Sequence, residues 1–198
     1  MIDFSTLTYV PNLVIRTSER AAIMNIPNTT ASLMLPIFTM VPVGKRGGAV
    51  LKRIQDMQGD LWARVVVEVG EDIDPNPGES PTNGHLFLRS LREENEDFRN
   101  WQDFIEANTN FIPTLLIPGN STDSDRIQSQ INRFEELQRG MVLKVRKHHT
   151  ERNPNIIYVY RDIVTEIARR ELQDQFLIVF DYGKIDNSEL TQNWCSTT

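Results

Sequence analysis

Ala63-Arg64-Val65-Val66-Val67-Glu68-Val69 is the stretch that decides the fold. It is short, β-branched and almost entirely apolar, which is typical of a strand that is covered on both faces. Its one acidic side chain, Glu68, stands near the carboxyl end of the run. Because strands of this kind occur mainly in parallel sheets, the stretch predicts a parallel α/β fold with its polar side chains at the carboxyl ends of the strands.

Similar runs recur along the chain, and most of them are separated by helical patterns. The expected strands are Tyr9–Arg16, Leu33–Met40, Ala63–Val69, Ile112–Pro118, Met141–Lys147 and Phe176–Tyr182. The expected helices are Glu19–Met24, Ala49–Met57, Leu88–Ala107, one with Thr122 as its N-cap that is closed by Gly140, one that begins at Pro154, and one that begins at Ser188. Right-handed crossovers make consecutive parallel strands neighbours. Six such units predict part or all of a TIM-like barrel, or alternatively an open doubly wound parallel sheet.

Length and composition indicate one soluble α/β domain, residues 1–198. The apolar fraction of 39% and the charged fraction of 24% are those of an ordinary globular protein. The net charge of -6 argues against nucleic-acid binding through bulk charge.

Cellular location is predicted from the cysteine count and the apolar runs. The single cysteine, Cys195, excludes an internal disulfide framework and fits a reducing compartment. The amino terminus lacks the pattern of a secretory signal, and the longest apolar run, Leu33–Val43, is interrupted by two prolines and is too short to span a bilayer. We therefore expect a cytoplasmic protein with no membrane contact.

Candidate site residues are the polar side chains near the carboxyl ends of the expected strands, since these point into the mouth of a barrel. They are Arg16, Glu68, Lys144, Arg146 and Asp181. In one interpretation Arg16, Lys144 and Arg146 bind the phosphate or carboxylate of a substrate, and Glu68 or Asp181 acts as a catalytic base. The alternative is a structural ion network, which we favour because buried opposite charges on adjacent strands must pair whether or not a ligand binds.

Motifs for metals and cofactors are missing from the sequence. His148 and His149 follow the fifth expected strand, and on an extended segment their side chains would point in opposite directions, which makes them a poor chelating pair. We interpret them as part of a solvated loop, with the alternative that one of them reaches the mouth of the barrel. His85 has no companion and is expected at the surface. The loop Gly44–Gly48 lacks the spacing of a phosphate-binding motif. We expect neither a metal nor a cofactor.

Several short motifs resemble the phage and prophage "beta protein" family. They are Tyr9-Val10-Pro11 with Leu13, Arg16, Glu19 and Ala22, then Leu35–Phe38, Ile112-Pro113, Met141–Arg146 and Val179–Gly183. The resemblance implies a TIM-barrel-like fold in a longer chain, an origin in phages or prophages, and no established catalytic activity. Where that family tends to have an acidic residue at the end of its second strand, this sequence has Thr39.

Three functional hypotheses follow. The first is an interaction protein in host–phage conflict, by analogy with the setting of the family. The second is an enzyme acting on an anionic substrate through Glu68, Arg146 and Asp181, and the third is an oligomeric structural or regulatory module. A full barrel usually needs about 250 residues, and six strands leave two bare edges. We therefore expect a truncated barrel: either the chain is the amino-terminal piece of a longer protein, or a protein partner or self-association closes the open edges.

Overall fold

The computed structural model describes Phe4, Leu7 and residues 9–23, 25–43, 48–59, 62–71, 73–118 and 124–183. Four features expected from the sequence lie wholly or mostly outside these residues: the glycine loop at 44–47, the N-cap Thr122, the helix from Ser188, and Cys195. No helix within the described ranges combines the length and the apolar character that crossing a membrane requires.

All strands of the described chain run parallel. They are β1 (Asn12–Val14), β2 (Ile37–Met40), β3 (Val65–Val69), β4 (Phe111–Pro113), β5 (Met141–Arg146) and β6 (Phe176–Asp181). The first four form one sheet in the order β1-β2-β3-β4, and the last two form a second sheet. The predicted parallel α/β fold is therefore confirmed.

Among the residues that the structure describes, one bridge connects the two sheets. Thr114, directly after β4, pairs with Val142 of β5, and the Leu115 N–H donates to the Val142 carbonyl at 2.8 Å. The strands thus follow one another in sequence order without the reversal that defines a doubly wound sheet. This order is that of consecutive βα units in a TIM-like barrel, and the described strands do not close it.

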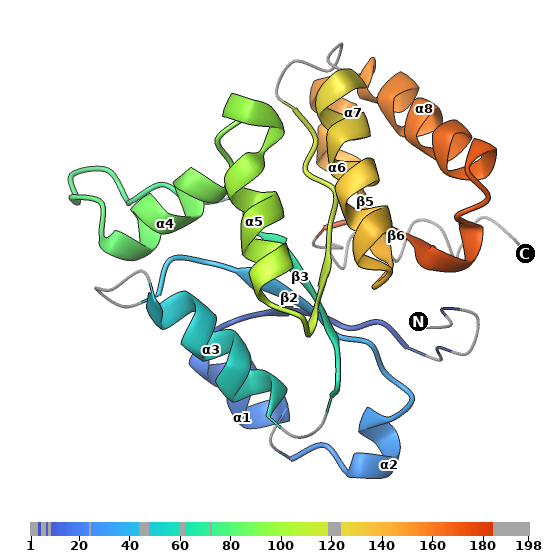
Figure 1. The fold of residues 1–198 in the computed structure, drawn as a ribbon. Coiled ribbons are helices and arrows are strands. Elements are labelled where there is room, and N and C mark those ends of the chain that lie inside the picture. The colour runs from blue at the N-terminus through green and yellow to red at the C-terminus, as the bar shows by residue number, and fades with distance from the viewer. Residues whose placement is uncertain are drawn as a thin grey trace, which may run out of the picture.

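Helices surround the strands (Figure 1). They are α1 (Thr17–Ile23), α2 (Asn28–Ala31), α3 (Gly48–Gln58), α4 (Asn83–Leu91), η2 (Asn95–Asp97), α5 (Arg99–Ala107), α6 (Ser124–Leu137), α7 (Lys147–Arg152), α8 (Ile156–Arg169) and η3 (Gln173–Gln175). Of the α-helices, α2 and α7 were not predicted from the sequence, and neither was the short 3₁₀ helix η3. All three are short and lack the long apolar stripe that reveals a packed helix.

Alternation along the strands divides the core in two. Side chains such as Phe38 and Val67 join the large cluster that includes the buried faces of the helices. Their neighbours Ile37 and Val66 point the other way and form a smaller cluster that spans the two sheets. The members of the smaller cluster are Leu35, Ile37, Val66, Ile112 and Val142, with Leu177 and Val179 packed against it. This is the layered interior expected of a barrel.

The helix predicted over Leu88–Ala107 is wrong in its continuity. It is two helices, α4 and α5, separated by a bend in which Glu96, Asp97 and Phe98 have positive φ angles. The apolar stripe nevertheless continues through the bend, because Phe98 is buried and both helices bury their apolar faces. Periodicity reports which side chains are buried, and it did not detect the break in the backbone.

His85 also differs from its predicted surface position. It is half-buried, and its ring closes a capping box with Thr82 at the start of α4, where Thr82 accepts from the His85 N–H and donates its own backbone N–H to the ring. The imidazole therefore serves the first turn of the helix.

Candidate functional site

The inner face of the strands changes from apolar to charged toward their carboxyl ends. Glu68 follows Val66 on this face of β3, and Lys144 and Arg146 follow Val142 on β5. The register places Thr39 beside Glu68 and Arg146 beside Asp181. Parallel strands therefore bring polar side chains from β2, β3, β5 and β6 to the same edge.

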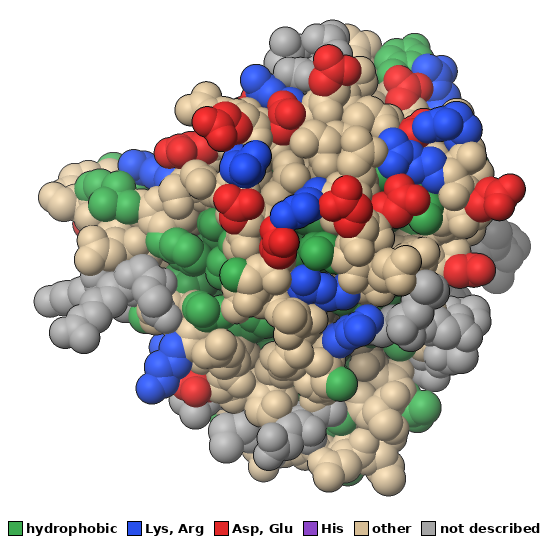
Figure 2. All heavy atoms as spheres, in the orientation of Figure 1, with side chains coloured by type: hydrophobic (Ala, Val, Ile, Leu, Met, Phe, Trp, Pro, Cys, Tyr) green, Lys and Arg blue, Asp and Glu red, His purple; other side chains and the backbone are tan. Residues whose placement is uncertain are grey.

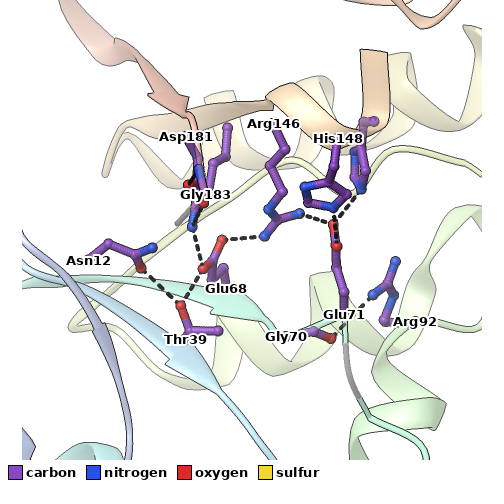
Figure 3. A network of polar contacts seen from close by, with 12 residues as sticks. Asn12, Thr39, Glu68, Gly70, Glu71, Arg92, Arg146, His148, Asp181 and Gly183 are labelled. Carbon is purple, nitrogen blue, oxygen red and sulfur yellow. Dashed lines mark hydrogen bonds and ion pairs between the residues drawn. The ribbon is translucent and has the colours of Figure 1, made fainter. Parts of the chain in front are cut away.

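Glu68 is the centre of the resulting network (Figure 3), and its side chain is 2% exposed. Lys144 Nζ lies 2.7 Å from Oε1, and Arg146 Nη2 lies 2.8 Å from Oε2. The Thr39 hydroxyl also hydrogen-bonds Oε1. Both carboxylate oxygens are thus occupied, which is the condition under which a buried charge is tolerated.

Lys144 extends the network to β6. Its ammonium, with the side chain 5% exposed, also contacts Asp181 Oδ2 at 3.0 Å. Asp181 accepts the Gly183 N–H at 2.9 Å. Although partial burial of Asp181 acts to raise the pKa of its carboxyl, the hydrogen bonds from Gly183 and Lys144 and the positive charge of Lys144 hold that pKa below its ordinary value. Asp181 is therefore ionised at neutral pH.

Thr39 connects the network to β1. Its hydroxyl oxygen lies 3.0 Å from Asn12 Oδ1 as well as against Glu68. Thr39 occupies the position at which the resembled family tends to have an acidic residue. It still makes a polar contact with Glu68. It supplies a hydrogen-bond donor in place of a second carboxylate, which would repel Glu68 at this distance.

Glu71 forms a second centre immediately beyond β3. Arg146 bridges the two centres, since its Nη1 lies 2.7 Å from Glu71 Oε1 while Nη2 contacts Glu68. The chain reaches Glu71 through Gly70, whose N–H donates to the Met40 carbonyl. If any other residue replaced Gly70, its Cβ would lie only 2.6 Å from that carbonyl oxygen. A glycine is required there for the backbone to pass so close to β2.

Both histidines of α7 contact Glu71. His148 Nε2 lies 2.6 Å from Oε2, and His149 Nε2 contacts Oε1. Burial acts to raise the pKa of Glu71, but the hydrogen bonds from His149 and His148 and the charge of Arg146 prevail and hold that pKa well below its usual range.

The predicted solvated loop at His148-His149 is therefore wrong. Residues 147–152 form the helix α7, and successive side chains on a helix are about 100° apart rather than opposite. The two rings meet edge to face with their centroids 4.6 Å apart, and both reach the same carboxylate. The extended backbone that the prediction assumed ends at Arg146.

A cavity of about 260 Å³ adjoins this second centre. Its basic lining comes from Arg92, His149 and Arg152. Arg92 donates to the Gly70 carbonyl at 3.2 Å, and burial lowers the pKa of its guanidinium from the ordinary value. The remaining lining is Glu94, Asn153 and apolar side chains, namely Phe98, Leu116, Ile117, Pro118 and Ile156. A mostly apolar hollow with a few convergent polar groups is typical of a small-ligand site.

A larger hollow of about 490 Å³ lies between α5 and α6, away from the strand ends. Its charges pair with one another or with neighbours: Arg133 with Glu106 and Glu136, and Arg99 with Asp103. Figure 2 shows acidic and basic side chains interspersed over the upper part of the molecule. We do not regard this hollow as a candidate site.

Four of the five predicted site residues come together: Glu68, Lys144, Arg146 and Asp181. Arg16, in contrast, is exposed after β1 and takes part in none of the side-chain contacts described for this network. The prediction missed Thr39, Glu71, Arg92, His148 and His149. Thr39 and Glu71 could have been found because they lie at, or two residues beyond, the end of an expected strand.

Comparison with known proteins bears directly on the resemblance noted in the sequence. A family model described as "Beta protein" matches residues 9–194. The chain belongs to the Beta protein family. No curated protein and no solved structure matches it. In this Beta protein family member the matched range runs from before β1 to beyond β6 and contains every residue of the two centres.

Proposed function

We propose that this Beta protein family member is a phage- or prophage-related protein that binds a small phosphate- or carboxylate-bearing ligand at the carboxyl ends of its strands. The observation that carries the proposal is the cavity lined by Arg92, His149 and Arg152. Guanidinium groups match the geometry of carboxylate and phosphate and form charge-assisted hydrogen bonds with them.

The cations of the network have a different role in this proposal. Lys144 and Arg146 are already neutralised by Glu68, Asp181 and Glu71. We assign Lys144, Arg146 and Glu68 to positioning: they fix the strand ends and hold Glu71 at the cavity side. An enzymatic form of the proposal, with Asp181 as catalytic base because its side chain is 26% exposed and that of Glu68 only 2%, needs a ligand that reaches beyond the cavity, since Asp181 does not line it. Arg16 does not line the cavity, so in this proposal it would contact only a ligand that extends beyond the cavity.

Calorimetric titration of the full chain with inorganic phosphate, in the presence of a metal chelator, tests the anion site. We expect saturable binding at millimolar phosphate. Arg92→Gln and Arg152→Gln should each weaken it by about tenfold, since each removes one charge-assisted contact. Succinate in place of phosphate distinguishes a carboxylate site from a phosphate site.

Arg161→Gln is the matched control, because Arg161 is an exposed arginine of α8 that pairs with its neighbour Asp162. It should leave the titration unchanged. Equal loss of binding in Arg161→Gln, or no binding of either anion by the wild-type chain, contradicts the proposed anion site.

A second candidate function is an interaction protein, with host–phage conflict as its setting. The specific observation is β6, which pairs with β5 alone among the described strands and has exposed aromatic side chains within it and directly after it. Phe180 is 63% exposed and Tyr182 is 67% exposed. Unpaired strand edges with apolar side chains accept a strand from a partner. In this proposal the partner, either a second copy or another protein, pairs with β6.

Light scattering during size-exclusion chromatography tests the self-association form of this candidate. The mass should exceed that of a monomer and rise with concentration, and Phe180→Lys should return it to the monomer value. Tyr158→Lys, which alters an exposed aromatic residue of α8, is the control and should leave the mass unchanged. A monomer mass for the wild-type chain at every concentration rejects self-association.

A further inference from the structure

We propose that Glu71, His148 and His149 form a binding site for one divalent transition-metal ion of the zinc class. The three side chains each offer a ligand atom, and these atoms all lie within 4.8 Å of one another. The inference rests on this cluster alone and does not require the anion site described above.

The donor set is that of a zinc-class ion. Two imidazole nitrogens and one carboxylate oxygen are among the ligands that Zn²⁺ prefers, whereas Mg²⁺ and Ca²⁺ prefer oxygen alone. Three protein ligands leave a fourth position for water or substrate, which is the arrangement of catalytic rather than structural zinc sites. His149 also lines the cavity of about 260 Å³, so the proposed site adjoins that cavity.

The geometry needs little rearrangement to accept the ion. His148 Nε2 and His149 Nε2 both point at the Glu71 carboxylate, with the first 2.6 Å from Oε2. Tetrahedral ligands with bonds of about 2.0–2.1 Å lie roughly 3.3 Å apart. Small side-chain rotations therefore separate the three atoms enough for a cation to replace the hydrogen atoms they now share.

Surrounding contacts favour the site without blocking it. Arg146 holds Glu71 from the side of Oε1 at 2.7 Å, and a carboxylate has lone pairs enough to keep this contact while it binds a metal. The buried Nδ1 of His149 has no hydrogen-bond partner among the described atoms, so rotation of that ring breaks no hydrogen bond on its far side. Glu71 follows β3 by two residues and α7 follows β5 directly, so the ends of two strands position the three side chains.

Zinc titration of the full chain, after treatment with chelator and desalting, tests the proposal with Zn²⁺ alone. Competition against a chromogenic chelator should show one ion per chain. His148→Ala, His149→Ala and Glu71→Gln should each weaken binding by at least about tenfold, since loss of even an outer-shell partner commonly costs that much. Co²⁺ should give the visible absorption of a four-coordinate ion in the wild-type chain and lose it in the variants.

Two controls account for the other zinc-binding side chains of the sequence. His85→Ala removes the third of the three histidines, and Cys195→Ser removes the only thiol. Both should bind zinc as the wild type does. Absence of saturable zinc binding, unchanged binding in all three site variants, or loss of binding in either control overturns the proposal.

Folding of each variant is checked by circular dichroism and by its melting temperature, which zinc should raise in the wild-type chain. Glu71→Gln also removes an ion pair with Arg146, so His148→Ala decides the question if Glu71→Gln fails to fold, because the His148 side chain is 39% exposed. The anion titration is performed with chelator present, so failure of the metal site leaves its result unaffected.

Discussion

Glu68 shows how one buried carboxylate organises a site. Lys144 and Arg146 occupy its two oxygens from β5, and Thr39 adds a hydrogen bond from β2. Breaking a buried ion pair by removing one partner is far more costly than the pair is worth, because the other charge stays buried without compensation. Loss of any one charge of the network is therefore expected to destabilise the protein, even if the whole network adds little net stability.

The substitution Glu68→Gln should lower the free energy of unfolding by about 2 kcal/mol, since it removes the carboxylate between Lys144 and Arg146 and leaves these cations with only Asp181 and Glu71 as acidic partners. Urea denaturation at neutral pH measures this. Glu136→Gln, on an exposed ion pair of α6, should change stability by less than about 0.5 kcal/mol. A loss at Glu68 as small as that at Glu136 would show that Glu68 is not buried among cations.

Sequence reasoning succeeded at the residue scale wherever strand alternation decides orientation. Lys144 and Arg146 are two residues apart on one strand, so their side chains lie on the same face. Both lie near the carboxyl end of that strand, as Glu68 and Asp181 do on theirs, which predicted that the four would lie close together. It failed for His148 and His149 because their directions depend on a helix only 6 residues long, which leaves no periodic signal.

At the element scale, ion pairs connect helices on the outside of the fold. Glu166, in the last turns of α8, accepts hydrogen bonds from Arg169 and Arg170, and Arg170 continues to Glu135 of α6 at 2.9 Å. Arg139, directly after α6, is buried and donates to the carbonyls of Ile105 and Asn108, where α5 ends. Guanidinium groups suit both roles because they present several donors in a fixed plane.

Acid should weaken the α8 contacts in a defined range. Hydrogen bonds from Arg169 and Arg170 lower the pKa of Glu166 to about 2, from an ordinary 4.5. A carboxyl whose pKa is depressed in the folded state contributes stability above its unfolded pKa and loses it as pH falls toward the folded value. Glu166→Gln should therefore be less stable than wild type by about 1 kcal/mol at pH 7.

Urea midpoints measured from neutral to acid pH check this expectation. The difference between wild type and Glu166→Gln should shrink below about pH 4.5 and vanish near pH 2. Asp162→Asn, an exposed acid of the same helix, should show no such trend. A difference that stays constant across the range would contradict the assigned pKa shift.

The boundaries of helices were harder to predict than their existence. The stripe that suggested one helix over Leu88–Ala107 is real, but three consecutive residues with positive φ divide it. Such a bend costs local backbone energy that only tertiary packing offsets, here the burial of Phe98. Local patterns do not contain that information.

For the whole molecule, the order of the strands is the central feature. Apolar runs separated by helices predicted parallel neighbours in sequence order, and the register confirms this for β1–β2, β2–β3, β3–β4 and β5–β6. The sequence did not predict that only one bridge, Thr114 to Val142, would connect β4 with β5. Pairing between strands depends on contacts distant in sequence, which periodicity does not report.

The two sheets are therefore held together at their carboxyl ends largely by side chains. Glu68 belongs to the sheet of four strands, and Lys144 and Arg146 belong to the sheet of two. The inner apolar cluster crosses the same junction through Val66, Ile112 and Val142. Both the candidate site and the arrangement of the two sheets therefore depend on the contacts that Glu68 makes across this junction.

A double-mutant cycle between Glu68 and Lys144 tests that claim most directly. Free energies of unfolding are measured by urea for the wild type, Glu68→Gln, Lys144→Met and the double variant. Direct contact across the junction predicts a coupling energy of at least about 1 kcal/mol. Additive effects, with a coupling energy below about 0.5 kcal/mol, would contradict the network and with it the placement of β5 beside the end of β3 and β4.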